Sequence, residues 1–290
     1  MMSGIGRPLG AAAAVIVAVT ALLVISWVLG SQLVRSTNSA VEPARAPAKD
    51  FSIATSDVVS LAATYRPGPS DDAPAALLHQ VAWSDTMESD GRFMLANNCR
   101  YSVALLQHCQ DNDVPFLYAS SAAVYGAGTE FREERACESP LNVYAYSKWL
   151  FDQYVRRLLP DRTSQIAGLR DFNGCGPREA HKGRMASVVW HFFRQYRADG
   201  KVQLFEGTGG YAAGEQQRDF VSIDDVVQVN LDFLDHSERS GIFNVGSGKA
   251  APFNAVAAAT INACRAAEGA SPMSFEALHQ AGAARDIAFP

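Results

Sequence analysis

A short apolar run that ends in small hydroxyl residues limits the possible folds of this 290-residue chain more than any other feature. Residues 114–121 pass from apolar and aromatic side chains to Ser120 and Ser121. A strand buried on both faces of a parallel sheet has such a continuous apolar run, and side chains at its carboxyl end reach the edge of the sheet. The run therefore predicts an α/β fold with Ser121 at the carboxyl edge of a buried strand.

Tyr144 and Lys148 form a second informative pattern. They are four positions apart, so on a helix they lie on the same face. A lysine ammonium there favours the ionised phenol, which lets a tyrosine accept or donate a proton near neutral pH. The same spacing also occurs by chance on ordinary amphipathic helices, and it is the serine-ended strand upstream that favours proton handling.

The central part of the chain resembles the ADP-L-glycero-D-manno-heptose 6-epimerases, a family of the extended short-chain dehydrogenase/reductase superfamily. The resemblance covers residues 80 to about 265 and residues 285–290. Seven blocks carry it, in the family's order and with nearly its spacing: SDTMESDG (84–91), FLYASSAAVYG (116–126), PLNVYAYSK (140–148), GPREAHKGRMASV (176–188), LFEGT (204–208), RDFV (218–221) and GIFNVGSG (241–248).

The resemblance implies an incomplete Rossmann-like parallel sheet of the extended short-chain dehydrogenase/reductase type, with a small substrate-binding subdomain. It also implies an isomerase in which NADP stores a hydride while a sugar carbon is oxidised and then reduced from its other face. Such an inversion needs a proton handler on each face. The matching residues imply Tyr144 and Lys182 in these roles, Ser121 hydrogen-bonded to the reacting oxygen, and Lys148 also at the nicotinamide ribose.

Two sets of binding residues follow from the same resemblance. The implied cofactor-binding set is Gln80, Val81, Ala82, Trp83, Ser84, Asn97, Lys148, Gly174 and Lys182, in which Gln80, Val81 and Trp83 depart from the family's pattern. The implied substrate-binding set is Asn173, Arg184, His191, Phe205, Glu206, Gly207, Thr208 and Arg218. Arginine suits the phosphate oxygens of an ADP-linked heptose. Taken alone, Arg218 would be expected in a surface ion pair with Asp219 or Asp224, and His191 would be a half-buried helix residue.

Asp171 and Cys175 stand where the family usually has aromatic residues. A buried carboxylate is costly unless it is paired or protonated, and Arg170 and Lys182 are the nearest plausible partners in the sequence. We therefore hypothesise that Asp171 captures Lys182 and weakens the second base. Restoring tyrosine at position 171 is then expected to raise turnover, and unchanged turnover in a folded variant would reject the hypothesis.

The cofactor half of the site is incomplete in the sequence. A dinucleotide-binding domain begins with a strand, a glycine-rich turn and a helix whose amino end holds the pyrophosphate, and no such pattern precedes Gln80. The loosely spaced Gly4, Gly6 and Gly10 follow no strand. We expect residues 80–290 to form a partial epimerase domain, lacking this start and the family's last substrate-binding elements, with weak NADP binding or none.

The first 79 residues differ in character from the rest. Residues 8–34 carry no charge and residues 11–29 are almost wholly apolar, which predicts a transmembrane-like helix within residues 1–34; a cleaved signal peptide is the alternative. Residues 35–50 predict a linker. Residues 51–79 predict a hairpin and a strand ending at His79, and resemble the start of a membrane-anchored α/β-hydrolase, although no GxSxG nucleophile motif is present. We hypothesise a junction between two proteins near His79.

The composition of the chain argues against some classes of function but identifies none. The net charge of -5 argues against nonspecific nucleic-acid binding. Five cysteines without metal spacing indicate reduced thiols, which favours a cytoplasmic body behind any membrane anchor; family resemblance implies a homo-oligomer. Three functional alternatives remain open. They are a nucleotide-sugar epimerase, which could also be a neighbouring epimerase or dehydratase of the superfamily, a catalytically inactive relative, and a membrane-tethered binding module.

Overall fold

The computed structural model describes residues 49–54, 60–65, 76–80 and 82–286. Contacts between Cα atoms divide the chain into two compact units. The first unit comprises Met1–Arg170 with Asp232–Phe243, and the second comprises Asp171–Leu231 with Asn244–Pro290. Each unit has its own hydrophobic core.

The first unit is built on a four-stranded sheet. Its strands are β3 (Leu77–His79), β4 (Phe116–Ala119), β5 (Ile166–Asp171) and β9 (Gly241–Val245), in the order β3-β4-β5-β9. β3 and β5 both run parallel to β4, with Leu77 opposite Phe116 and Phe116 opposite Ile166. Residues 116–118 are buried, as are residues 166–170. This confirms the predicted buried parallel strand and its α/β context.

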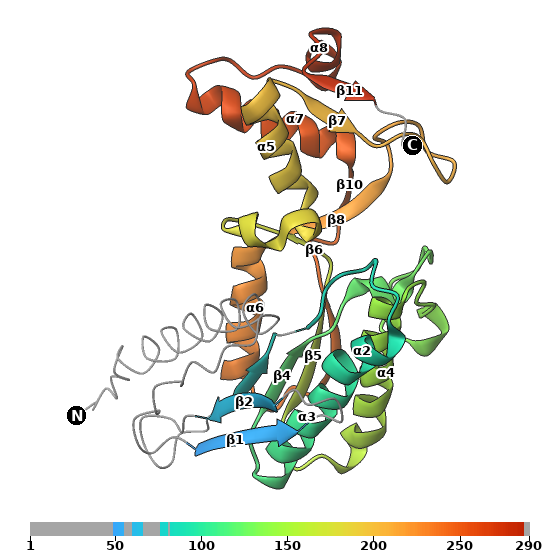
Figure 1. The fold of residues 1–290 in the computed structure, drawn as a ribbon, viewed down its shortest axis with the longest axis vertical. Helices are drawn as coiled ribbons and strands as arrows, with labels where there is room; N and C mark the ends of the chain where they lie inside the picture. The colour runs from blue at the N-terminus through green and yellow to red at the C-terminus, as the bar shows by residue number, and fades with distance from the viewer. Residues whose placement is uncertain (1–48, 55–59, 66–75, 81, 287–290) are drawn as a thin grey trace, which may run out of the picture. The chain divides into compact units, whose positions relative to one another are not determined.

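Helices cover one face of this sheet (Figure 1). They are α2 (Gly91–Leu95), α3 (Tyr101–Asp111) and α4 (Val143–Leu158), with one π-helical turn η1 (Ala96–Arg100) joining α2 to α3. Their apolar residues meet those of β4 and β5 in a core that includes Leu106, Phe116 and Phe151, each at most 1% exposed. Burying one such side chain contributes roughly 1.5–3 kcal/mol, so this core fixes α4 against the sheet.

Short helical turns connect the larger elements of the first unit. They are η2 (Ala122–Tyr125), η3 (Arg135–Cys137) and η4 (Leu159–Asp161). The Asn142 side chain caps α4 by accepting a hydrogen bond from Ala145 N at 2.8 Å. Capping of this kind satisfies an amide that the helix cannot bond itself, and here it fixes the start of the helix that carries Tyr144.

The region upstream of β3 contains the predicted hairpin. β1 (Lys49–Ala54) pairs antiparallel with β2 (Ser60–Tyr65) in a separate two-stranded sheet, so β1 begins two residues before the predicted start of the hairpin at residue 51. The strand predicted before Gln80 is β3. The predicted membrane segment and residues 35–48 lie outside the described residues. Within the described ranges, no helix combines the length and the apolar character needed to cross a membrane.

The second unit contains two small sheets. One has the order β10 (Ala250–Pro252), β8 (Gln217–Ser222), β6 (Asn173–Cys175), and the other pairs β11 (Ala284–Asp286) with β7 (Val202–Leu204). Its helices are η5 (Glu179–Met185), α5 (Val188–Asp199), α7 (Phe253–Ala267) and α8 (Phe275–Gln280), while α6 (Ile223–Asp235) crosses the boundary between units. α5 packs against α7 around a core that includes Phe192, Leu204 and Ile261.

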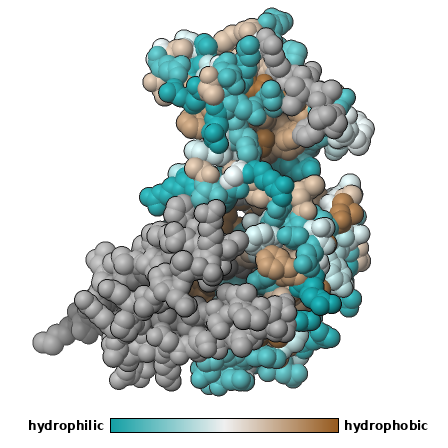
Figure 2. Space-filling model, in the orientation of Figure 1, coloured by the Kyte–Doolittle hydropathy of each residue, from teal (hydrophilic) through white to brown (hydrophobic). Residues whose placement is uncertain are grey.

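The second unit has a largely polar surface on one face, and the cysteines of the chain are unpaired. On the face drawn in Figure 2, the described surface of the second unit is mostly hydrophilic. All five cysteines are free thiols, and burial raises the pKa of Cys109 to about 12. A thiol with so high a pKa stays protonated near neutral pH and is therefore unreactive.

Candidate functional site

The structure places Ser121, Tyr144 and Lys148 on adjoining elements of the first unit. Ser121 follows β4 after one residue, Ser120, and caps η2, accepting a hydrogen bond from Ala123 N at 3.2 Å. Tyr144 and Lys148 lie on α4. Lys148 is only 5% exposed, and its Nζ donates to the carbonyl of Ala119 at 2.6 Å. The lysine therefore holds α4 against the carboxyl end of the strand that delivers Ser121.

The buried side chain of Asn98 supports the helical turn that carries Tyr144. Asn98 Nδ2 donates to Ser147 Oγ at 3.0 Å, and that hydroxyl donates to the carbonyl of Tyr144 at 2.7 Å. Asn98 also exchanges two hydrogen bonds with the backbone of Trp83, at 2.7 and 2.9 Å. Asn98 was not predicted from the sequence. It joins the segment after β3 to the helix with the Tyr-Lys pair.

The predicted cofactor segment follows β3 and is only partly enclosed. Gln80, Ala82 and Trp83 are half-buried and Ser84 is exposed, whereas Val81 lies outside the described residues. Asn97 donates from Nδ2 to the carbonyl of Phe93 at 2.8 Å. Gly174 belongs to β6 of the second unit. The first unit thus brings Asn97 and the segment after β3 to the same edge of the sheet as Lys148.

This edge offers groups for one end of a dinucleotide more clearly than for the other. Tyr144 and Lys148 lie on α4 at this edge, and the indole Nε1 of Trp83 is buried without a hydrogen-bond partner among the described residues. The described residues from 49 to 90 contain no glycine, so this stretch supplies no glycine-rich cradle for a pyrophosphate. The residues present therefore fit a dinucleotide only in part.

His79 is a neutral, structural histidine at the end of β3. It is 5% exposed, and its Nε2 lies 2.7 Å from Ser102 Oγ. Because that hydroxyl donates to the carbonyl of Asn98, the histidine must be the donor. Burial, together with the positive charge of Lys148, lowers the pKa of His79 to about 3. The ring consequently stays uncharged at neutral pH.

A buried ionic network lies between β4, β5 and α4. Arg170 and Asp152 are both fully buried, and Arg170 donates to Asp152 Oδ2 from Nε at 3.0 Å and from Nη2 at 2.7 Å. Arg170 also bonds Glu138 at 2.5 Å. Burial raises the pKa of the Asp152 carboxyl, and the Arg170 charge opposes that rise. Arg170 was one of the two predicted partners of Asp171. The carboxylates that it binds here are those of Asp152 and Glu138.

Lys182 and Arg184 lie exposed on η5 in the second unit, and His191 lies half-buried on α5. The buried carboxylate of Glu179 shapes this segment: it accepts from Gly176 N at 3.0 Å and from both the amide and the hydroxyl of Ser187. Lys182 Nζ lies 3.9 Å from Glu179 Oε2. Glu179, which the sequence reasoning passed over, is therefore the carboxylate that pairs with Lys182, while the proposed capture by Asp171 stays a hypothesis.

Arg218 and the 205–208 segment meet at the start of α7. The Arg218 guanidinium lies 6.0 Å from the ring centroid of Phe253, and the Phe205 ring lies 4.8 Å from the same ring. Asp219 does not pair with Arg218 as the surface ion-pair alternative required. It accepts instead from Ser247 N at 2.9 Å and from Gly248 N at 2.8 Å. Among the described residues, the Arg218 side chain forms no ion pair and is exposed.

The remaining residues of the predicted substrate set belong to the same part of the second unit. Asn173 donates from Nδ2 to the carbonyl of Asp219 at 3.1 Å. Glu206, Gly207 and Thr208 are exposed, and Gln216 donates to the carbonyl of Glu206 at 2.5 Å. A side chain at position 207 would lie 2.6 Å from the carbonyl oxygen of Tyr211. The loop therefore requires glycine at that point, and it presents Thr208 beside β8.

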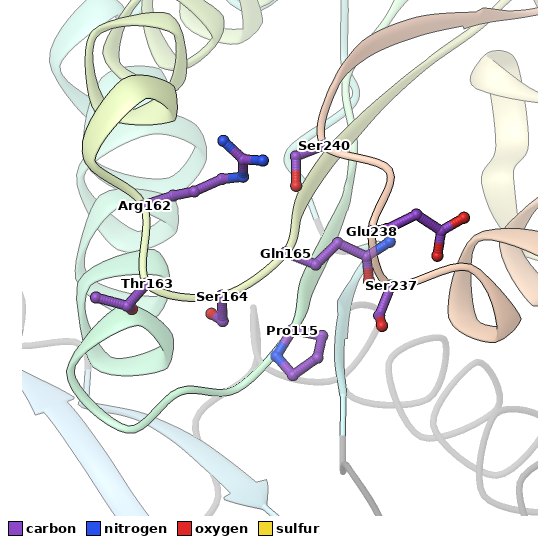
Figure 3. A pocket seen from close by; sticks show the side chains of 8 residues that line it. All are labelled: Pro115, Arg162, Thr163, Ser164, Gln165, Ser237, Glu238 and Ser240. Carbon is purple, nitrogen blue, oxygen red and sulfur yellow. The ribbon is translucent and has the colours of Figure 1, made fainter.

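A polar hollow of about 440 Å³ lies elsewhere in the first unit (Figure 3). It is lined by Pro115, Arg162, Thr163, Ser164, Gln165, Ser237, Glu238 and Ser240. Pro115 and Gln165 directly precede β4 and β5. The hollow is therefore at the amino edge of the sheet, opposite the edge that carries Ser121 and Lys148, and does not belong to the candidate site.

Comparison with known proteins decides the family. Residues 32–246 match the model of the NAD dependent epimerase/dehydratase family. Over 223 residues, 77% of this chain, the sequence is 62% identical to ADP-L-glycero-D-manno-heptose-6-epimerase of Thiobacillus denitrificans. The chain belongs to this epimerase family. The family resemblance inferred from the sequence blocks, and with it membership of an isomerase family, is confirmed.

Solved structures support the same fold. The crystal structure of ADP-L-glycero-D-manno-heptose-6-epimerase from Helicobacter pylori is 33% identical, with a TM-score of 0.59 over 69% of this chain. UDP-glucose 4-epimerase of Thermus thermophilus, solved with NAD, is 27% identical with a TM-score of 0.54 over 69% of this chain. This chain spans 67% of the Thiobacillus protein, 60% of the Helicobacter structure and 64% of the Thermus structure.

Proposed function

We propose that this chain is an NADP-dependent isomerase that inverts carbon 6 of an ADP-linked heptose for the lipopolysaccharide core, with activity lowered by its incomplete cofactor site. The observation that carries the proposal is the anchoring of Lys148 to Ala119 beside Ser121. This contact supports a Tyr-Lys pair standing at the carboxyl edge of a parallel sheet. Ligands of open α/β sheets bind at that edge.

The proposed roles follow from the chemistry of inversion. Tyr144 and Lys182 serve as the two proton handlers, one for each face of carbon 6, and Ser121 holds the reacting oxygen. Lys148 binds the nicotinamide ribose and favours the ionised Tyr144 phenol. NADP, when bound, supplies the hydride chemistry. The remaining residues of the two sets described above bind the cofactor and the substrate.

Arg218 is the proposed contact for the substrate diphosphate. Its guanidinium is exposed, and among the described residues it forms no ion pair, because Asp219 is engaged by Ser247 and Gly248. Phe253 lies beneath the guanidinium, which limits its motion before a ligand arrives. A planar guanidinium that is preoriented and lacks an ionic partner suits phosphate oxygens.

The same proposal includes a location and partners. The substrate is a small nucleotide-sugar, nucleic acid is not a partner, and the folded body is cytoplasmic and self-associates as a homo-oligomer. Residues 8–34 attach it to a membrane. Fractionation of cells that express the full chain, compared with a variant lacking residues 1–48, tests the attachment, which recovery of both proteins in the soluble fraction would refute.

A catalytically inactive relative is the second candidate. It is favoured by one observation, the absence of glycine from the described residues between 49 and 90. Without a glycine-rich turn the pyrophosphate would be held weakly, and the protein would lack the NADP that accepts the hydride. The two candidates differ in a direct assay of an ADP-linked heptose. NMR of the sugar would reveal inversion at carbon 6 by the first candidate and no change by the second.

Substitution of the proposed base makes the assay specific. We expect Tyr144→Phe to lower kcat by about 10²–10⁴-fold, the usual contribution of one positioned acid or base. Tyr146→Phe is the matched control, because Tyr146 lies on the same helix and is 44% exposed. Equal activity of Tyr144→Phe and the parent protein, when both are folded by circular dichroism, would exclude the proposed role.

A further inference from the structure

The buried carboxylate of Asp152 faces the same direction as the Tyr-Lys pair. Asp152 follows Lys148 by four residues and Tyr144 by eight on α4, so the three share one face of the helix. It accepts from the Tyr118 hydroxyl at 2.9 Å and from Ser120 Oγ at 2.9 Å. Tyr118 is the next-to-last residue of β4, and Ser120 lies between the strand and Ser121.

Arg170 extends these contacts to two further segments. Besides its two bonds to Asp152, it donates from Nη1 to the Tyr125 hydroxyl at 3.0 Å, and its guanidinium lies 5.0 Å from the Tyr125 ring centroid. Tyr125 ends η2, the turn that Ser121 caps. Glu138, which Arg156 also binds, receives the remaining contact of Arg170. One side chain of β5 therefore touches α4, η2 and the segment before α4.

The charges within the network compensate one another. It contains two guanidinium groups, Arg156 and Arg170, and two carboxylates, Glu138 and Asp152. Burial acts to lower the pKa of Arg170, but Asp152 and Glu138 outweigh it and raise that pKa. Buried charges are tolerated when they are paired and hydrogen-bonded, and removal of one partner leaves the other exposed to a large desolvation cost. The geometry of the network is therefore strongly determined.

We propose that Asp152 and Arg170 are positioning residues for Ser121, Tyr144 and Lys148, because they join the helix face that carries the pair to the strand end and turn that carry the serine. This inference rests on the proposed function. Neither residue touches substrate or cofactor in this proposal. A catalytic constellation must be held within a fraction of an ångström by its supporting groups, and this network is the support that the first unit provides.

The test compares Asp152→Asn with Val155→Ala in the full chain. Asn is nearly isosteric with Asp but removes the charge and half of the accepting capacity. Val155 is fully buried one turn away on α4 and makes no polar side-chain contact, so Val155→Ala loosens the helix without disturbing the network. We expect Asp152→Asn to lower kcat by about 100-fold relative to Val155→Ala, with KM changed by no more than about two-fold.

A second readout needs no turnover. Lys148 is buried whereas Lys201 is exposed, so the acetylation rate of Lys148 relative to Lys201, read by mass spectrometry, measures how well Lys148 is held. We expect this ratio to rise roughly ten-fold in Asp152→Asn, as local opening becomes easier, and to stay near the parent value in Val155→Ala. If Asp152→Asn does not fold, Ser120→Ala, which removes one bond to Asp152, replaces it with a smaller expected rise.

The kcat measurement and the acetylation ratio distinguish a failure of the proposed function from a failure of the positioning role. If the parent protein does not invert the heptose, the proposed function fails, and the acetylation ratio still decides whether the network positions Lys148. An unchanged ratio in the folded Asp152→Asn or Ser120→Ala variant would overturn the positioning role. A kcat loss in Asp152→Asn no greater than that in Val155→Ala would overturn it as well.

Discussion

At the scale of single residues, the interior of the first unit separates buried polar groups by protonation state. His79 is kept neutral by its surroundings, while Arg170 is kept charged by the carboxylates it binds. Neutral and charged groups thus coexist within one sheet and its covering helix. What distinguishes them is a partner: the histidine bonds a hydroxyl and the arginine bonds anions.

His79 makes stability depend on pH in a defined window. Its folded-state pKa of about 3 lies below the ordinary value of 6.5, so the unfolded chain binds the proton more tightly. Its contribution is complete above pH 6.5 and is lost as the pH falls toward 3, by about 1.4 kcal/mol per pH unit at most. Denaturant unfolding between pH 4 and pH 7 is expected to show this slope.

The contribution of His79 is isolated by substitution. His79→Gln keeps an amide donor for Ser102 but cannot titrate, so its unfolding free energy should depend less on pH than that of the parent. His236→Gln is the control, because the His236 side chain is half-exposed and its hydrogen-bond and ionic contacts are with Asp232, four residues earlier. Parallel pH slopes for His79→Gln and the parent would contradict the assignment of His79 as a buried neutral group.

At the scale of elements, two short segments position Ser121 and Lys182. In the first unit this segment is the β4 end with η2, and in the second unit it is η5 with its flanking residues. Neither has a long helix or strand of its own to stabilise it. Each depends on one buried carboxylate: Asp152 receives the serine and tyrosine hydroxyls of β4, and Glu179 receives the amides at both ends of the η5 segment.

Glu179→Gln is expected to loosen the segment that presents Lys182. A glutamine has one acceptor and one donor group where the carboxylate accepted on both oxygens, so at least one of the Gly176 and Ser187 donors loses its partner. An unsatisfied buried group costs about 1–3 kcal/mol. Hydrogen exchange should therefore accelerate at the Gly176 and Ser187 amides.

The control for this prediction is the exposed Glu206. Glu206→Gln should change stability by no more than about 0.5 kcal/mol, as is usual for surface substitutions, and should leave exchange at residues 176–187 unaltered. Protection of the two amides that persists in Glu179→Gln would show that other contacts fold the segment.

The elements near the Tyr-Lys pair could be predicted from sequence because their signals are local. A continuous apolar run identified β4, and a four-residue spacing placed Tyr144 and Lys148 on one helix face. The supporting groups depend on distant pairings: Arg170 meets Glu138 from 32 positions away, and Asn98 meets Ser147 from 49. The one local signal of the network in the sequence is Asp152, an acidic residue one helical turn after Lys148. It was not part of the predicted site.

At the scale of the whole molecule, the described sheet ends at β3. β3 pairs with β4 and stands at the edge of the described four-stranded sheet, while the β1–β2 hairpin forms a separate one. The hairpin therefore does not extend the four-stranded sheet within the described residues.

We predict that the purified full chain carries little or no NADP. Amides at the amino end of a helix, reached through a glycine-rich turn, usually hold the pyrophosphate, and the described residues before Gly91 include no glycine. The measurement is chromatography of nucleotides released by denaturing the protein, with a known amount of added NADP as the recovery control. One NADP per chain would show that the pyrophosphate is held by another route.

The place of Arg170 in the chain has a consequence for biosynthesis. Glu138 and Asp152 precede it, so both carboxylates leave the ribosome before their shared guanidinium. Arg156 also precedes Arg170 and pairs with Glu138, so until β5 has been made α4 cannot settle on β4 without burying the Asp152 carboxylate unpaired. Packing of the helix that bears the Tyr-Lys pair is thereby delayed until residue 170 has been translated, and a chain released earlier would be left open to proteolysis.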